Sequence, residues 1–361
     1  MSTNVRVLYI FANERKQMEQ EWQEGIMPDT YFIGLNHLQK FGVKAEYIEN
    51  KIINFIRNKS FNLTNIFLLF KIRKYDIVFS GSSLMIVFLA KVIFRFRKPK
   101  FVWYNTFFTN LLKRNRNDLK GWIIRKSIGA LDAIICPSQA QKDFLVKEGF
   151  SQDKIYFIPT GVDVDFIALR QKVLPDYDGE KYILAVGRDM GRDYKTLIEA
   201  LRGLDIKLKI AALPRNFSGL DVNNLPENVE FLGFVPFNKL VGFYKNAEFV
   251  IIFTKKEDDF DGSDCSGHLV MLDAMASGKA LIASYRSTIG DYIKNGQEGI
   301  LVEPGNQKEL REVIEKLLKN PQLARDMGNK AREKAAEMLT TEIFAKNLAE
   351  IFDRIFQDLG K

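Results

Sequence analysis

The sequence has 361 residues, of which 46% are hydrophobic and 27% are charged, so it is long enough for two soluble domains of ordinary size. Its two cysteines and two histidines exclude a disulfide framework and argue against a metal site. The N-terminus lacks the pattern of a signal peptide, and no apolar run reaches the roughly 18 residues that a membrane span needs. We therefore expect a cytoplasmic protein that holds no metal ion.

The net charge of +8 is unevenly distributed along the chain. Residues 1–170 contain 26 Lys and Arg against 15 Asp and Glu, whereas the remainder contains 27 against 30. Within Lys51–Lys126 there are 17 basic residues and only two acidic ones, Asp76 and Asp118. A block of this kind is typical of a surface that binds an anionic partner, either membrane lipid or nucleic acid.

Short β-rich runs alternate with helical patterns through the whole chain. Because strand–helix alternation produces parallel sheets with helices on both faces, the pattern predicts an α/β fold. The expected strands are 5–11, 43–48, 76–80, 100–105, 132–136 and 154–158 in the first half, and 182–186, 207–212, 229–231, 249–253, 280–283 and 299–302 in the second.

The alternation occurs twice, with a break at 163–180 that shows no strong periodicity. The last periodic segment, 340–359, is an amphipathic helix with no strand after it, and we expect it to cross back and pack on the first domain. The predicted domains are 1–165 together with 340–361, and 175–339. In open α/β sheets ligands bind beyond the carboxyl ends of the strands, so the loops at those ends are the places to search for a site.

The first candidate site is the turn that follows the strand ending at Val186. Gly187 permits a tight turn there, and a helix begins near Tyr194. A glycine turn that leads into a helix N-terminus and carries guanidinium groups is suited to a diphosphate. The alternative is an ordinary strand–helix turn with solvated basic side chains. The basic residues on it are Arg188, Arg192 and Lys195.

The second candidate site precedes the predicted helix Leu269–Ala276. Ser266 and Gly267 come directly before it, so its free N–H groups can bind a phosphate or sugar oxygen. Asp273, one turn further along, can accept two ribose hydroxyls. The alternative is a packing helix that carries an incidental acid.

The third candidate segment is Asn228–Val235, which closes a strand and enters a loop. Phe234 and Val235 can present backbone groups and an apolar face to a nucleobase. A turn that ends in proline explains the same residues equally well.

Together and in order, these segments resemble the retaining, metal-independent glycosyltransferases of family 4, which have the GT-B fold. The resemblance covers nearly the whole chain and is strongest over 130–345. It implies two Rossmann-like domains with parallel sheets facing across a cleft, an acceptor-binding N-terminal domain, and a C-terminal domain that binds a nucleotide-diphosphate sugar as substrate, with no cofactor. The matching motifs are Val-Gly-Arg at 186–188, Asn-Val-Glu-Phe-Leu-Gly-Phe-Val at 228–235, Asp-Ala-Met at 273–275, Gly-Lys-Ala-Leu-Ile at 278–282 and the linker signature Ile-Pro-Thr-Gly-Val-Asp at 158–163.

The resemblance also assigns roles to individual residues. Arg188 and Arg192 would stabilise the negative charge that grows on the leaving diphosphate. The expected donor-binding residues are Gly187, Lys195, Phe234, Val235, Ser266, Gly267, His268, Leu269 and Asp273.

The sequence departs from the family pattern at four positions. One is His268, which stands where many members have glycine and can point at the donor phosphates. The first glutamate of the family pair falls on Cys265, so Asp264 before it is the candidate catalytic contact to the transferred sugar. The second glutamate is the shorter Asp273. A histidine that many members carry after the fourth strand is replaced by Asn105, which we expect on the acceptor side.

Two other functions share some of these features. A nucleotide-sugar epimerase can have the same fold, but the sequence shows no acid–base groups for it. A nucleic-acid-binding protein would explain the basic block, but no recognition-helix or RNA-binding signature is present. A possible metal-binding pair, Asp258-Asp259, lies in a charged loop and is expected to be solvated.

The basic block also mixes cations with bulky apolar residues, as in Lys91–Tyr104 and Asn105–Lys126. Apolar side chains flanked by cations, with almost no acids, are typical of a segment that lies at a membrane interface. We therefore expect a lipid-linked or polysaccharide acceptor and peripheral association of Lys51–Lys126 with the cytoplasmic membrane face. A solvated basic surface is the alternative.

Overall fold

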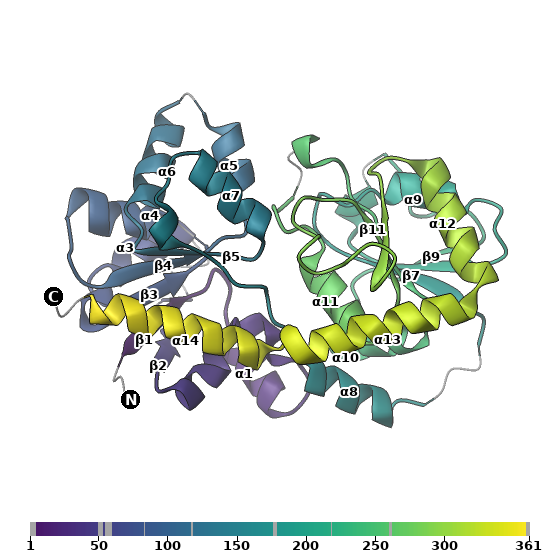
Figure 1. The fold of residues 1–361 in the computed structure, drawn as a ribbon, viewed down its shortest axis with the longest axis horizontal. Coiled ribbons are helices and arrows are strands. Elements are labelled where there is room, and N and C mark those ends of the chain that lie inside the picture. Colours follow the sequence, from purple (N-terminus) through teal and green to yellow (C-terminus); the bar gives the residue numbers. More distant parts are fainter. Residues whose placement is uncertain are drawn as a thin grey trace. The chain divides into compact units, whose positions relative to one another are not determined.

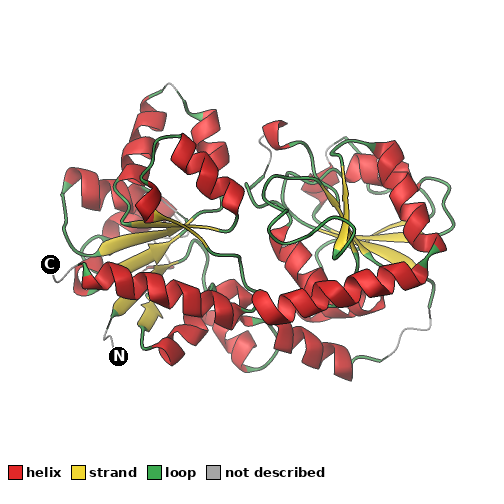
Figure 2. Cartoon of the chain, in the orientation of Figure 1, coloured by secondary structure: helices red, strands yellow, loops and turns green. Residues whose placement is uncertain are grey.

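The computed structural model describes residues 5–49, 53–54, 60–82, 84–116, 118–175, 179–217, 219–259 and 262–358. The chain divides into two compact units. Unit 1 comprises Met1–Glu24, Asp29–Gly161 and Thr341–Lys361, and unit 2 comprises Gly25–Pro28 and Val162–Thr340. Each unit contains a parallel sheet with helices around it (Figures 1 and 2). Among the described helices, none is both long and apolar enough to span a membrane.

The sheet of unit 1 has six strands in the order β2-β1-β3-β4-β5-β6. Every neighbouring pair is parallel. The strands are β1 (Arg6–Ile10), β2 (Lys44–Tyr47), β3 (Ile77–Ser80), β4 (Lys100–Tyr104), β5 (Ala133–Cys136) and β6 (Ile155–Phe157). The helices are α1 (Lys16–Gln23), α3 (Phe61–Leu68), α4 (Met85–Val87), α5 (Phe108–Arg114), α6 (Leu119–Gly129), α7 (Gln139–Lys147) and α14 (Thr341–Gln357), with 3₁₀ turns η1 (Asp29–Phe32), η2 (Leu35–Phe41), η3 (Ile72–Lys74) and η5 (Gln152–Lys154) and the π-helical segment η4 (Phe88–Ile93).

Side chains of unit 1 alternate between two cores because successive residues of a strand face opposite sides of a sheet. Leu8 and Ile10 of β1 pack with α3, α4, α5, α6 and α7 on one face. Val7 and Tyr9 pack with η2 and α14 on the other. The C-terminal helix α14 buries Phe352 edge-on against Phe79 of β3, so the prediction that it packs on the first sheet is confirmed.

The sheet of unit 2 also has six parallel strands, in the order β12-β11-β10-β7-β8-β9. Helices α9 and α12 pack together over one face of the sheet, while α8 packs against α10 and α11. The strands are β7 (Tyr182–Val186), β8 (Lys207–Ala211), β9 (Val229–Phe231), β10 (Val250–Ile252), β11 (Leu281–Ser284) and β12 (Gly299–Val302). The helices are α8 (Val164–Val173), α9 (Tyr194–Leu201), α10 (Phe237–Asn246), α11 (His268–Ala276), α12 (Gln307–Lys319) and α13 (Pro321–Met338), with 3₁₀ turns η6 (Pro214–Phe217) and η7 (Glu257–Asp259).

The α/β prediction is confirmed, and each expected strand corresponds to one of β1–β12. The segment 163–180, which we expected to be irregular, instead contains helix α8 and belongs to unit 2. Its first turn is capped by Asp163, whose carboxylate accepts a hydrogen bond from the amide of Phe166 at 3.0 Å. Apolar and polar residues are spread around this helix, which removes the periodic signal.

Candidate functional site

The guanidinium of Arg192 lies in unit 2 between two glycine turns that are far apart in the sequence. A Cβ added to Gly187 would be 2.0 Å from Nε of Arg192, and one added to Gly267 would be 2.9 Å from its Nη1. Both glycines have positive φ, +152° and +96°. Only glycine allows this approach, so the fold brings the first and second candidate segments together around one arginine.

Arg192 is 4% exposed, yet its Nε and Nη1 have no hydrogen-bond partner in the described structure. Its backbone amide donates to the carbonyl of Asp189 at 3.3 Å, which holds the turn. A buried guanidinium with two unpartnered nitrogens is unfavourable and requires an explanation. An anion bound beside α11, whose N-cap is Gly267, would provide both the charge and the hydrogen-bond acceptors that are missing.

Arg188 and Phe234 of the same unit contact each other. The guanidinium carbon of Arg188 lies 5.2 Å from the centre of the Phe234 ring, a cation–π distance. Phe234 is 59% exposed, so its other face is open to a ligand. Val235 next to it is half-buried, and Lys195 is exposed on the first turn of α9. The third candidate segment therefore lies beside the first.

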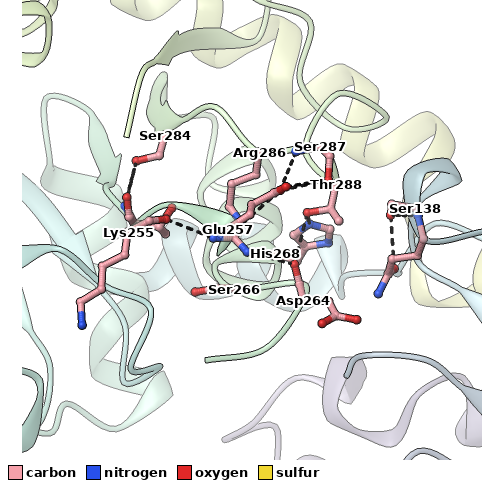
Figure 3. A network of polar contacts seen from close by, with 12 residues as sticks. Ser138, Lys255, Glu257, Asp264, Ser266, His268, Ser284, Arg286, Ser287 and Thr288 are labelled. Atoms are coloured by element: carbon pink, nitrogen blue, oxygen red, sulfur yellow. Dashed lines mark hydrogen bonds and ion pairs between the residues drawn. The ribbon is translucent and has the colours of Figure 1, made fainter. Parts of the chain in front are cut away.

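A polar network fixes the loop before α11 (Figure 3). The carbonyl of Asp264 accepts from Nη2 of Arg286 at 3.5 Å and from the hydroxyl of Thr288 at 3.4 Å. Glu257 lies 3.8 Å from Nε of Arg286 and accepts from the amide of Ser287 at 2.7 Å. Asp264 is buried, with 4% of its surface exposed. The loop that carries the candidate sugar contact is thus anchored to the loop after β11.

His268 does not act as a charged group. Its Nε2 lies 3.1 Å from the hydroxyl of Thr288, and its ring packs edge-on against Tyr292 at 4.9 Å between centres. Burial, and secondarily the nearby Arg286, lower the pKa of His268 to about 3, so the imidazole is neutral at physiological pH. Its Nδ1 is buried and has no hydrogen-bond partner among the described residues, and the expectation that His268 points at the donor phosphates stays a prediction. Leu269, the next residue of α11, is 42% exposed.

Asp273 is a buried carboxyl on the second turn of α11, 5% exposed. No hydrogen bond to its carboxyl occurs among the described residues of unit 2. Burial raises the pKa of Asp273 to about 8, so the group is protonated at neutral pH in the absence of a ligand. A carboxyl in this state can donate one hydrogen bond and accept others, which suits a pair of ribose hydroxyls.

Asn105 of unit 1 is fully buried. Its Oδ1 accepts from the amide of Phe108 at 2.9 Å, and its Nδ2 lies 3.7 Å from Sγ of Cys136. Its carbonyl accepts from Nε2 of Gln141 at 3.2 Å. These contacts hold the start of α5 and the first turn of α7 at the end of β4. They give Asn105 a structural role, and its place on the acceptor side stays a prediction.

Sequence reasoning missed Asp189, Arg286 and Thr288, whose contacts join loops that follow different strands.

No group of three or more His, Cys, Asp or Glu residues that could hold a metal ion occurs in the part of the chain that the structure describes. Asp258 and Asp259 are exposed.

Two family models match the chain. Residues 167–334 match "Glycosyl transferases group 1" and residues 35–166 match "Glycosyltransferase Family 4". An uncharacterized glycosyltransferase of Methanocaldococcus jannaschii is 27% identical over 314 residues, which cover 80% of this chain and 77% of the relative.

A second relative is 26% identical over 235 residues, which cover 62% of this chain and 61% of the relative. It is the N-acetylgalactosamine-N,N'-diacetylbacillosaminyl-diphospho-undecaprenol 4-alpha-N-acetylgalactosaminyltransferase of Campylobacter jejuni. Among solved structures, Anabaena HepE in complex with UDP-glucose superposes with a TM-score of 0.70 at 14% identity, covering 97% of this chain and 100% of that one. This likeness concerns the fold alone. With its two matched family models and its paired parallel sheets, the chain belongs to the family 4 glycosyltransferases of GT-B type.

Proposed function

We propose that this glycosyltransferase moves a sugar from a nucleotide-diphosphate donor to an acceptor hydroxyl, with retention and without a metal ion. The observation that supports the proposal best is the buried guanidinium of Arg192, held between Gly187 and Gly267 with two unpartnered nitrogens. A diphosphate has the charge and the acceptor oxygens that this group lacks.

Catalysis then follows from where charge develops. As the glycosidic bond breaks, negative charge grows on the departing diphosphate, and a cation fixed beforehand stabilises the transition state more than the ground state. Arg192 supplies the buried cation, Arg188 an exposed one, and the N-terminus of α11 a partial positive charge. Retention of configuration is proposed from membership of the family.

The nucleoside end of the donor is assigned to Asp273 and to the loop of Phe234. The carboxyl of Asp273 would bind the ribose hydroxyls, and the exposed face of Phe234 would contact the base. Asp264, anchored by Arg286 and Thr288, is the candidate contact to the transferred sugar. Because the fold neighbour HepE was solved with UDP-glucose, uridine nucleotides are the first donors to test.

The acceptor is proposed to be lipid-linked, or a polysaccharide, at the cytoplasmic membrane face. Large apolar side chains are exposed on segments that pack on one face of the unit 1 sheet: Phe70 after α3 is 82%, Phe94 after η4 55% and Trp122 of α6 51% exposed. A cation lies close to one of them, since the ring of Phe94 stacks on that of Phe96 at 5.9 Å between centres and the guanidinium of Arg73 is 5.3 Å from the centre of the Phe96 ring. Exposed aromatic groups beside cations favour an anionic lipid surface. The name of the Campylobacter relative describes an undecaprenol-linked acceptor.

A thermal-shift screen tests the donor proposal. One family of nucleotides among UDP, GDP, ADP and their sugars should raise the melting temperature, because a ligand that binds only the folded chain stabilises it. The shift and the subsequent transfer should survive EDTA. If none of these ligands gives a shift, or if activity requires added magnesium or manganese, the proposed site is wrong. Donor turnover without acceptor would instead favour an epimerase.

A further inference from the structure

The carboxylate of Asp189 connects the two glycine turns that surround Arg192. Its Oδ1 accepts from the amide of Gly191 at 2.8 Å and from the hydroxyl of Ser266 at 2.7 Å. Its Oδ2 accepts from the amide of Ser263 at 3.1 Å. Gly191 belongs to the same turn as Asp189, whereas Ser263 and Ser266 belong to the loop before α11. One side chain therefore ties together segments more than seventy residues apart.

The loop is shaped to fit this carboxylate closely. A Cβ added to Gly262 would lie 1.8 Å from Oδ1 of Asp189, and Gly262 has φ of +80°. Ser266 is 1% exposed, and its amide donates to the carbonyl of Ser263 at 3.2 Å. The loop thus turns directly over Asp189, and its hydroxyl and amide donors point inward.

The contacts of Asp189 continue to the proposed anion site. Ser266 immediately precedes Gly267, and a Cβ at Gly267 would be 2.9 Å from Nη1 of Arg192. On the other side, the carbonyl of Asp189 accepts from the amide of Arg192 at 3.3 Å. Both halves of the anion site, the guanidinium and the start of α11, are therefore held by the same residue.

We infer that Asp189 is a positioning residue that sets the distance between Arg192 and the N-terminus of α11, and so determines affinity for the diphosphate of the donor. The inference rests on the proposed donor site. A carboxylate would repel a diphosphate if it contacted it directly. Asp189 instead directs its oxygens to three donors of the protein, so it acts through Arg192 and Gly267.

Calorimetric titration separates this role from a general effect on folding. The probes are the nucleoside diphosphate among UDP, GDP and ADP that binds the unmodified chain best, and the corresponding nucleoside without phosphates. Asp189→Ala should lower the affinity for the diphosphate by about tenfold or more and change the affinity for the nucleoside by less than about twofold, because only the phosphate contacts depend on the loop. Ser266→Ala, which removes one of the three hydrogen bonds to Asp189, should lower the affinity for the diphosphate by roughly threefold. Asp205→Ala removes an exposed carboxylate of the same unit and should change neither.

A double-mutant cycle with Arg192→Ala completes the test. If Asp189 acts through Arg192, the loss in the double variant should be clearly smaller than the product of the two single losses. Any of three results would overturn the inference. The losses of diphosphate affinity in the two single variants could multiply in the double variant, or Asp189→Ala could weaken diphosphate and nucleoside equally. Diphosphate binding could also be unchanged in both Asp189→Ala and Ser266→Ala. If Asp189→Ala does not fold, Ser266→Ala and Asp189→Asn carry the same comparison. Unchanged diphosphate binding in Arg192→Ala would instead refute the donor site itself.

Discussion

The Arg188 guanidinium lies over the ring of Phe234, 5.2 Å from its centre, so the cation assigned to the donor diphosphate is in contact with the residue assigned to its base. Arg188→Ala should lower turnover by roughly 10²-fold if the cation stabilises the transition state. Phe234→Leu keeps an apolar side chain but removes the aromatic face, and should mainly raise the donor KM. Steady-state kinetics measure both effects. If Phe234→Leu lowered kcat as much as Arg188→Ala does, the assignment of Arg188 to the diphosphate and of Phe234 to the base would be contradicted.

Gly267→Ala should remove most of the activity although it adds a single methyl group. The new Cβ would be 2.7 Å from Cγ2 of Ile252 and 2.9 Å from Nη1 of Arg192, at a φ of +96°. Arg192 must then move or the turn must change, and we expect turnover to fall by at least about tenfold. Gly290→Ala is the matched control, because its Cβ would meet no atom within 4 Å. Near-normal kinetics in Gly267→Ala would place the donor elsewhere.

Asp273 gives the stability of unit 2 a defined pH dependence. The pKa of about 8 in the folded chain is above the value of about 3.9 of an unfolded chain. The folded state therefore retains a proton that the unfolded state has released, and this contribution to the free energy of unfolding is lost as the pH rises from about 4 through 8. In Asp273→Asn that loss should disappear. Urea unfolding at several pH values measures it, with Asp205→Asn as the exposed control. Parallel pH profiles for wild type and Asp273→Asn would show that the carboxyl is not protonated.

Truncation of the same residue should weaken nucleotide binding. If Asp273 binds the ribose, Asp273→Ala, which removes both the donor and the acceptor, should lower affinity for the sugar donor and for the free nucleoside diphosphate by similar factors. Asp264→Asn should lower affinity for the intact donor and leave the diphosphate almost unchanged. Titration of both ligands against both variants decides the matter, and equal losses at Asp264 would reject its assignment to the sugar.

The basic and aromatic segment Lys51–Lys126 of unit 1 should bind anionic liposomes in a salt-sensitive way and should bind neutral liposomes weakly. Each cation near an anionic leaflet contributes about 1 kcal/mol, so changing Lys113, Arg114 and Arg116 to Glu should reduce co-sedimentation strongly. Trp122→Ser should also reduce co-sedimentation but should change its salt dependence little, because the side chain that is lost contributes an apolar contact with the lipid and no charge. Lys308→Glu is the control, because the Lys308 side chain is exposed on helix α12 of unit 2. Failure to co-sediment at low salt would favour a soluble acceptor.

Much of this architecture could be predicted from the sequence because its signals are local. Short β-rich runs, helix starts and glycine turns each occupy a few adjacent residues, and so the twelve strands and the turns at Gly187 and Gly267 were predictable. Helix α8 gave no signal because its apolar residues form no stripe. The role of Asp189 depends on hydrogen bonds to residues more than seventy positions away. The orientation of His268 depends on Thr288 and Tyr292 in another loop, and a single sequence contains no record of either contact.

The exposed aromatic side chains on the helical layer of unit 1 also affect how the chain behaves in a test tube. The exposed side chains of Phe70, Phe94 and Trp122 lie in water, and exposed apolar groups of this size promote self-association as the concentration rises. Purified chain should therefore be more prone to aggregate in dilute buffer than its charge of +8 suggests, and mild detergent should keep it dispersed. High salt, which usually releases basic proteins from contaminants, should increase this tendency, since it screens the repulsion between copies and leaves the apolar attraction in place.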